Sequence, residues 1–483
     1  MARQADAVGS VPAGVIEQPD VGTLNVEQHG FDHIAESERY LRPRALFTFW
    51  LGSNAYLYYV LIGAIVLSLG LSLAATIAAM VLGFAMYLLV GVASVGGARS
   101  GLPTMTLTRA PFGVRGNRIN TLLAWFELLA FEALNAIFGV FAFVALAAEV
   151  GWADSGAAGY VVGTFVVIGI SALVAIYGHR LLFLAQKVFA IGLTAVLVVV
   201  AAVTIGTVDW GYPGTLEGPA AIGMFLVGTA IVAAAPLSFL IVCADYPRYL
   251  PANTPAGPIV GWTFAGAASI SLFLGIVGAA LATGGAELSV DPVGGMKPLI
   301  PTWLFLIYAV AAAGGSVANN AITFYSSGLT LQAIGLPLRR WRATLLDCVI
   351  ATVLVLYILL VNQDLATTTA NFLAILNVWV GPFGAIWVTD GILRRWRYEP
   401  ADIHTNSPAS RYWGTSGFKV AGLAALAVGV VVGILTINAP VFQGPLSKVF
   451  FDGDLAWIAA PLSGAIAYWL LARRSLREGR EPA

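Results

Sequence analysis

Charged residues are scarce in this chain, because Asp, Glu, Lys and Arg make up only 10% of its 483 residues. A soluble domain carries about 25% charged residues. Hydrophobic residues account for 59%, and the mean hydropathy is +0.84. Such an excess of apolar surface has to face lipid. The formal net charge is zero, which excludes a bulk electrostatic attraction to nucleic acid.

Residues for metal, disulfide or covalent chemistry are also few. The two cysteines, Cys243 and Cys348, lie in separate apolar stretches, so we expect packing residues rather than a disulfide or zinc frame. The four histidines lack metal-ligand spacing. The sequence has no phosphate-binding loop and no Ser–His pairing. We therefore expect neither an enzyme nor a bound cofactor.

Long apolar runs are abundant. We count twelve segments of the roughly 20 residues that cross a bilayer, all between residues 45 and 473. Residues 1–44 are polar, lack the apolar core of a signal peptide and are predicted to form a disordered tail. Residues 474–483 form a second tail. Every Lys and Arg except Lys297 and Lys448 falls on one side of this arrangement, which predicts a cell-membrane protein with both termini cytoplasmic.

Two of the apolar runs contain helix breakers. The first, "FWLGSNAYLYYVLIG", carries Gly52, Ser53 and Asn54 in its middle, and the sixth, "GTAIVAAAPLSFLIVCADY", carries Pro236 and Ser238. Interrupted helices five spans apart indicate an inverted-repeat transporter with a site at mid-membrane. Glycine and proline are also common in ordinary membrane helices, so the spacing alone leaves the repeat open.

Carboxyl groups occur inside the third run, which contains Glu127, Glu132 and Asn135. Glu127, Phe131 and Asn135 follow an i, i+4, i+8 spacing and share one helical stripe. An intramembrane carboxylate marks a functional site by default, here one that binds a planar polar ligand and couples it to a proton. The alternatives are a solvated Glu127 near the cytoplasmic end and a neutral Glu132 that hydrogen-bonds another helix.

Two further runs carry polar or bending residues. Asn319 and Asn320 lie side by side in the eighth run, where amides could read the edge of a heterocycle or join helices. Gly381 and Pro382 in the tenth run indicate either a gate or a simple kink.

Four stretches in this order resemble one family. "GARSGLPTMTLTRAPFGVRGNR", "ADYPRYLP", "NNAITFYSSGLTLQAIGL" and "WVGPFGAIWVTDGILRR" are similar to segments of the nucleobase–cation symporters, and the resemblance spans about residues 40–400. The purine–cytosine permease branch is the most similar. The resemblance implies an all-α membrane protein with twelve transmembrane helices and the leucine-transporter-type fold. Two inverted repeats of five helices would cover 45–207 and 220–393, followed by two extra helices within 417–473.

The "CADYPRYLP" stretch lies at the cytoplasmic end of the sixth run. Asp245 and Arg248 have the i, i+3 spacing of an ion pair. We expect this segment to shape a cytoplasmic loop rather than to contact a ligand.

The resemblance also implies site residues. An aromatic side chain on helix three stacks on the substrate, and helices one, six and eight complete the site. The matching positions are Asn54, Tyr59, Phe131, Asn135, Ser238, Phe239, Asn319 and Asn320. Phenylalanine stands where relatives often have tryptophan, which removes an indole donor but keeps a stacking face.

Coupling is predicted from helix eight. Sodium-driven relatives use two hydroxyls there, whereas the matching positions here lie among Ala313, Gly314 and Gly315. We expect a proton rather than sodium, carried by Glu132 or Glu127, although backbone carbonyls could still hold sodium. The expected function is import of a nucleobase or related N-heterocycle. The alternatives are a same-fold carrier of allantoin, a hydantoin or a thiamine-like ring, with sodium coupling included, and a channel or receptor. The expected partners are the substrate, the coupling cation and the lipid bilayer.

Overall fold

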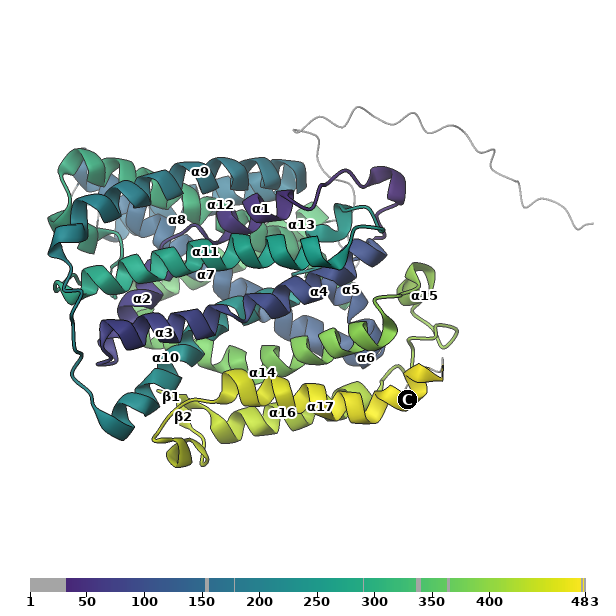
Figure 1. Ribbon diagram of the computed structural model, residues 1–483. Coiled ribbons are helices and arrows are strands. Elements are labelled where there is room, and N and C mark those ends of the chain that lie inside the picture. Colours follow the sequence, from purple (N-terminus) through teal and green to yellow (C-terminus); the bar gives the residue numbers. More distant parts are fainter. Residues whose placement is uncertain are drawn as a thin grey trace, which may run out of the picture.

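The computed structural model describes residues 32–152, 156–177, 179–289, 291–335, 340–362, 365–478 and 481. These residues form a helical bundle with a single two-stranded hairpin, β1 (Asn438–Ala439) and β2 (Phe442–Gln443). Helices satisfy their backbone hydrogen bonds internally, which lipid requires. Figure 1 shows most of the long helices lying roughly parallel along one bundle axis.

The first half of the chain contributes α1 (Ala45–Asn54), α2 (Tyr58–Ser68), α3 (Leu73–Phe84), α4 (Tyr87–Ser100), α5 (Thr104–Leu107), α6 (Arg109–Phe112), α7 (Gly116–Glu149), α8 (Gly156–Tyr177) and α9 (His179–Thr204). The second half contributes α10 (Gly218–Ser238), α11 (Ala256–Thr283), α12 (Thr302–Ile334), α13 (Arg340–Tyr357), α14 (Leu365–Arg394), α15 (Pro400–His404), α16 (Val420–Thr436) and α17 (Ala456–Arg477). Short helical turns are η1 (Glu36–Glu38), η3 (Ile205–Thr207), η4 (Phe239–Ile241), η5 (Pro247–Tyr249), η6 (Gly294–Leu299), η7 (Ile358–Asn362) and η8 (Ser447–Phe450).

Ten candidate membrane spans can be counted in the described residues. Nine are long apolar helices, and the tenth is the pair α1–α2, which is bent by 57° at its break. The two remaining predicted spans are α16 and α17. α16 has only 17 residues, and α17 ends in a basic turn that lowers its hydropathy. The count therefore reaches ten rather than the predicted twelve.

The packing of the two halves follows a paired pattern. The contact of α1 with α9 in the first half corresponds to that of α10 with α14 in the second. The contact of α2 with α11 likewise corresponds to that of α10 with α3. α7 contacts α8 as α12 contacts α13, and α7 itself packs along α12. α16 and α17 lie together against α14 at the outside of the bundle (Figure 1). Each of these contacts in the first five spans thus has a counterpart in the next five.

The first predicted interruption is confirmed, and in the sixth run the α-helix ends two residues after Pro236, which itself lies inside α10. α1 ends at Asn54 and α2 begins at Tyr58, while α10 ends at Ser238 and continues only as η4. Polar side chains stabilise the first break, because Ser53 Oγ donates to the carbonyl of Phe49 at 2.7 Å and Asn54 Nδ2 donates to that of Trp50 at 2.8 Å. The two breaks leave non-helical backbone buried inside the bundle.

The segment that precedes α1 is ordered where the structure describes it. The amide of Ile34 donates to the carbonyl of Gly101 at 3.0 Å, and that of Leu41 to Tyr249 at 3.0 Å. Arg39 Nη1 donates to the carbonyl of Ala98 at 2.8 Å. The predicted disordered tail is therefore wrong for residues 32–44, because they pack on the loops after α4 and η5; residues 1–31 lie outside the described residues.

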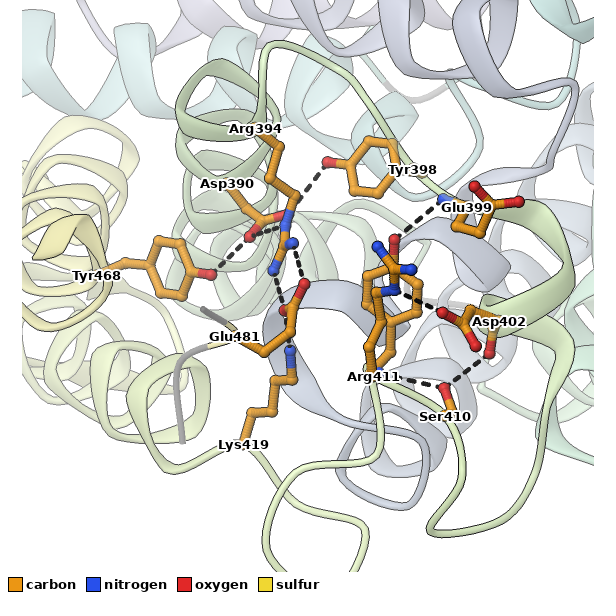
Figure 2. Close-up of polar contacts among 11 residues, drawn as sticks. Asp390, Arg394, Tyr398, Glu399, Asp402, Ser410, Arg411, Lys419, Tyr468 and Glu481 are labelled. Atoms are coloured by element: carbon orange, nitrogen blue, oxygen red, sulfur yellow. Dashed lines mark hydrogen bonds and ion pairs between the residues drawn. The ribbon is translucent and has the colours of Figure 1, made fainter. Parts of the chain in front are cut away.

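The C-terminal end is also anchored, in a buried charged cluster (Figure 2). Arg394 Nε pairs with Asp390 at 2.8 Å, and its two terminal nitrogens each donate to Glu481 at 2.6 Å. Lys419 Nζ donates to Glu481 at 2.5 Å, and Tyr468 Oη donates to Asp390 at 2.6 Å. This end of the chain lies on the same end of the bundle as residues 32–44 (Figure 1).

Electrostatics explains why the carboxylate of Glu481 stays ionised in that cluster. Burial alone would raise its pKa, but its hydrogen bond and charge interaction with Arg394, together with Lys419, lower the pKa overall. Burial lowers the pKa of Lys419 even though Glu481 opposes this change. The cluster ties the last described residue to α14 and to the start of α16.

Candidate functional site

A pocket lies where the two helix breaks meet α7 and α12. Its lining comes from α1–α2, α7, α10, η4 and the turns after it, and α12. Aromatic and amide side chains dominate. The lining residues are Tyr56, Tyr58, Tyr59, Leu128, Phe131, Asn135, Ala235, Ser238, Phe239, Ile241, Val242, Tyr246, Asn319, Ile322 and Thr323.

Aromatic rings form much of the wall. Phe131 of α7 packs edge-on against Phe372 of α14, with centroids 5.0 Å apart. Phe239 of η4 packs at 89° on Trp50, with centroids 5.1 Å apart. These neighbours restrain both rings, which can then present a fixed face to a planar ligand.

A series of side-chain hydrogen bonds joins α7 and α12 at the pocket. Asn135 Nδ2 donates to Asn319 Oδ1 at 2.9 Å and to Thr323 Oγ1 at 3.3 Å. Asn319 Nδ2 in turn donates to the carbonyl of Ser53 at the first helix break. Asn135 Oδ1 is buried and accepts no hydrogen bond from the described residues. A buried acceptor of this kind is costly unless a ligand or water supplies a donor.

Six of the eight predicted binding residues line this pocket: Tyr59, Phe131, Asn135, Ser238, Phe239 and Asn319. Asn54 does not. Its Oδ1 accepts hydrogen bonds from the hydroxyls of Tyr59 and Tyr87, and its Nδ2 bonds Trp50. Asn54 therefore stabilises the end of α1 rather than facing a ligand.

Asn320 is the second correction. We expected it to share a cavity with Phe131 and Phe239, but it does not line the pocket. Successive residues of an α-helix point about 100° apart, and here the side chain of Asn319 reaches the pocket whereas that of Asn320 points elsewhere. Asn320 is fully buried, and its amide has no partner among the described residues.

Three further tyrosines complete the wall and were not predicted: Tyr56, Tyr58 and Tyr246. Tyr56 and Tyr58 stack at 11° with centroids 5.6 Å apart. Tyr246 comes from the "CADYPRYLP" stretch and shares a 2.9 Å hydrogen bond with Ser326 of α12. Tyr246 therefore lies in the pocket wall, although we expected this stretch to shape a cytoplasmic loop only. The dense tyrosines of both motifs were the signal in the sequence.

The charged residues of that stretch lie behind the pocket. Asp245 accepts hydrogen bonds from the amide of Thr104 at 2.9 Å and from its hydroxyl at 3.0 Å. Arg248 remains an electrostatic neighbour of Asp245 and donates to Tyr325 Oη at 2.9 Å. Burial raises the pKa of Asp245 to about 6, although the bonds from Thr104 and the charge of Arg248 oppose this. These contacts join α5, η5 and α12 beneath the pocket.

The two predicted coupling carboxylates do not line the pocket. Glu127 is 3% exposed and Glu132 is fully buried, so Glu127 is not solvated as the alternative required. Neither carboxyl forms a hydrogen bond of good geometry with the described residues. The Ser327 hydroxyl lies close to Glu132 without such geometry.

A resident metal site is not formed by the described residues, which contain no group of three or more His, Cys, Asp or Glu that could hold a metal ion. Gly314 and Gly315 stand where sodium-driven relatives were expected to carry hydroxyl side chains, and both glycines are tightly packed. A Cβ at Gly315 would lie 2.9 Å from the carbonyl oxygen of Ala55, and one at Gly314 would lie 2.2 Å from the ring of Phe189. α12 is therefore packed closely on the first helix break at Gly315 and on α9 at Gly314.

Comparisons with known proteins identify the family of this chain. The family described as "Permease for cytosine/purines, uracil, thiamine, allantoin" matches residues 33–459. A relative from Bacillus subtilis (strain 168), named "Putative purine-cytosine permease YxlA", is 26% identical over 475 residues, which cover 94% of this chain and 98% of that protein.

Two solved structures share the fold. Mhp1, a nucleobase-cation-symport-1 family transporter in a closed conformation with bromovinylhydantoin bound, superposes with a TM-score of 0.74 at 15% identity, covering 95% of this chain and 97% of Mhp1. A Na⁺-coupled sialic acid symporter in a substrate-bound outward-open state superposes with a TM-score of 0.55 at 13% identity, covering 90% and 92% of the two chains.

Proposed function

This chain belongs to the family of permeases for cytosine/purines, uracil, thiamine and allantoin, and from that premise we propose that it is a secondary active symporter. It imports a nucleobase or a related small N-heterocycle, with a proton as the coupling cation. It is a multi-pass membrane protein of a transporter family rather than an enzyme.

The observation that carries this proposal is a buried acceptor without a partner in the described part of the chain, in a pocket lined by aromatic rings. Asn135 Oδ1 lacks a partner in the described residues, and Phe131 and Phe239 line the same pocket. A nucleobase can make both interactions. Its flat face stacks on an aromatic ring, and its ring edge carries N–H groups that can donate to the asparagine oxygen. Asn319 supports this edge contact by holding Asn135 in place.

Proton coupling is supported by three features. Ala313, Gly314 and Gly315 supply no hydroxyl for sodium, and the carbonyl of Ser53 at the helix break is already bonded by Asn319. Glu132 offers a buried titratable group three residues from Asn135 on α7. Sodium held by backbone carbonyls around Gly52 is the competing arrangement.

The proposed architecture has twelve spans with α16 and α17 as the last two. The paired packing of the first five and next five spans supports inverted repeats over 45–207 and 220–393. The placement of both described ends on one end of the bundle (Figure 1) supports an even number of crossings. The distribution of Lys and Arg favours cytoplasmic termini.

A second candidate substrate class is the ureides and hydantoins. Mhp1, which shares the fold, is a transporter with bromovinylhydantoin bound. Such five-membered rings also present N–H donors next to carbonyls, so the same asparagine could bind them. A thiamine-like ring belongs to the same alternative.

A thermal-shift panel on purified protein tests the proposal. We expect cytosine, uracil or a purine base to raise the melting temperature in a concentration-dependent way, because a ligand that binds only the folded state stabilises it. Stabilisation by allantoin or a hydantoin alone would favour the second candidate. The absence of any shift with all of these rings would contradict both.

A further inference from the structure

A buried acidic residue of α13 that sequence reasoning did not select lies against α7. Asp347 is fully buried, and its Oδ1 accepts a 2.8 Å hydrogen bond from the indole Nε1 of Trp125. Its second oxygen, Oδ2, is buried and has no hydrogen-bond partner among the described residues. A half-satisfied carboxyl group inside a membrane bundle is costly and calls for a function.

Asp347 is an electrostatic neighbour of Glu132, and the Ser327 hydroxyl of α12 lies close to both carboxyl groups. Cys348 also faces this pair from α13. Among the described side chains, no Lys, Arg or His acts as an electrostatic neighbour of either acid. Three helices therefore enclose two carboxyl groups without a compensating cation.

Two carboxylates in such a site cannot both ionise, because burial and their mutual repulsion both disfavour the second charge. We propose that Glu132 and Asp347 form one carboxyl pair that binds the coupling proton, with Trp125 as the positioning residue of Asp347. This inference rests on the proton-coupled function proposed above.

The geometry also connects the pair to the pocket. Asn319, Thr323 and Ser327 follow an i, i+4, i+8 stripe along α12, so one face of this helix runs from the pocket to the pair. On α7, Glu132 precedes Asn135 by three residues and lies on a neighbouring part of the same face. A substrate that changes how Asn135 meets Asn319 shifts the two helices that also hold Glu132 and Ser327.

This arrangement couples substrate and proton by linkage. If a bound substrate favours the protonated pair, protonation favours substrate binding by the same factor. When the pair becomes accessible to cytoplasmic water, its proton leaves to that water and the substrate affinity falls. No oxidant, metal or covalent intermediate is needed, and the charge that moves is the proton alone.

The test uses the full-length protein and five variants: Glu132→Gln, Asp347→Asn, the double variant, Trp125→Phe and Asp454→Asn. Asp454 is a buried carboxyl group near the start of α17, far in sequence from the pair, and serves as the matched control. Proton uptake on binding of the base found in the thermal-shift panel is measured with a pH indicator in weakly buffered detergent solution. Counterflow exchange in proteoliposomes shows that each variant folds and carries substrate.

We expect wild type and Asp454→Asn to take up protons on binding. Glu132→Gln, Asp347→Asn and the double variant should each lose this uptake to the same extent while retaining exchange, because the two acids act as one unit. Trp125→Phe should keep the uptake but move its midpoint to higher pH, since the indole N–H stabilises the ionised form of Asp347.

Proton uptake by Asp347→Asn equal to that of wild type would overturn the pair, even if Glu132→Gln loses it. Separate partial losses that add in the double variant would likewise overturn it. A failure of the proposed function looks different, because wild type itself would then bind no heterocycle or take up no protons on binding.

Discussion

Asn135 on α7 donates a 2.9 Å hydrogen bond to Asn319 on α12 in the wall of the pocket. This bond uses the amide nitrogen of Asn135 and leaves its buried oxygen without a partner among the described residues. In the proposed site the same two residues join the helices and offer the group that recognises the substrate. The α7–α12 contact would then be a part of the binding site.

Separate replacement of Asn319 and Asn320 of α12 shows which of the two binds the substrate and which only packs between helices. We expect Asn319→Ala to weaken binding of the transported base by about 1–3 kcal/mol, roughly 5- to 150-fold, because Asn135 loses the partner that orients it. Asn320→Ala should leave the affinity within a few fold, since Asn320 does not line the pocket. Isothermal titration of both variants measures this, and a larger loss from Asn320→Ala would contradict the assignment.

The ring of Phe131 is predicted to stack on the substrate. Stacking of a base on an aromatic side chain contributes about 1–3 kcal/mol, so Phe131→Leu should lower affinity roughly 5- to 150-fold. Phe131→Trp should retain affinity, because the indole keeps a stacking face. Competition binding with the two variants checks this. Equal affinities for wild type and Phe131→Leu would exclude stacking on this ring.

The C-terminal anchor should respond to pH. The pKa of Glu481 is held below its ordinary value of 4.5 by Arg394 and Lys419, so the ionised carboxylate stabilises the fold above that value. This stabilisation is lost as pH falls through the lower, folded-state pKa. Glu481→Gln should lower the melting temperature near neutral pH, with a loss of about 1–3 kcal/mol, and the difference from wild type should shrink in acid.

The exposed Glu399 of the same region (Figure 2) provides the control for that measurement. Glu399→Gln should melt like wild type at every pH. A Glu481→Gln difference that stays constant from neutral to acidic pH would show that charge pairing does not anchor this end of the chain.

Orientation can be tested with two single cysteines. Glu287 is exposed between α11 and η6, and Ala409 is exposed between α15 and α16. In intact cells an impermeant thiol reagent should label Glu287→Cys directly and Ala409→Cys only after permeabilisation, because the basic residues favour cytoplasmic termini. The reverse labelling pattern would invert the proposed topology. The native Cys243 is buried, and the parent protein corrects for background labelling.

Local chemistry explains what the sequence could predict. Gly52 to Asn54 and Pro236 weaken a helix, and both helices end within two residues of them, so the positions of both helix ends were predictable. Phe131 and Asn135 share a stripe by their spacing alone, and both line the pocket.

Other features depend on how helices rotate and pack, which spacing does not determine. Asn319 and Asn320 are indistinguishable in sequence, and only the packing of α12 against α7 decides which one faces the pocket. The sequence does not show that Asp347 of α13 lies beside Trp125 of α7, because that contact depends on how the two helices pack. The order of residues 32–44 depends on distant carbonyls, such as that of Ala98, which accepts from Arg39.

The central claim is most directly tested by uptake of a labelled base, cytosine or a purine, into proteoliposomes without sodium under an imposed inward proton gradient. The account predicts uphill accumulation by wild type that collapses when the gradient is dissipated. It predicts that Glu132→Gln exchanges internal for external base at a rate near that of wild type but accumulates none. Accumulation that follows sodium and ignores pH, or undiminished pH-driven accumulation by Glu132→Gln, would contradict it.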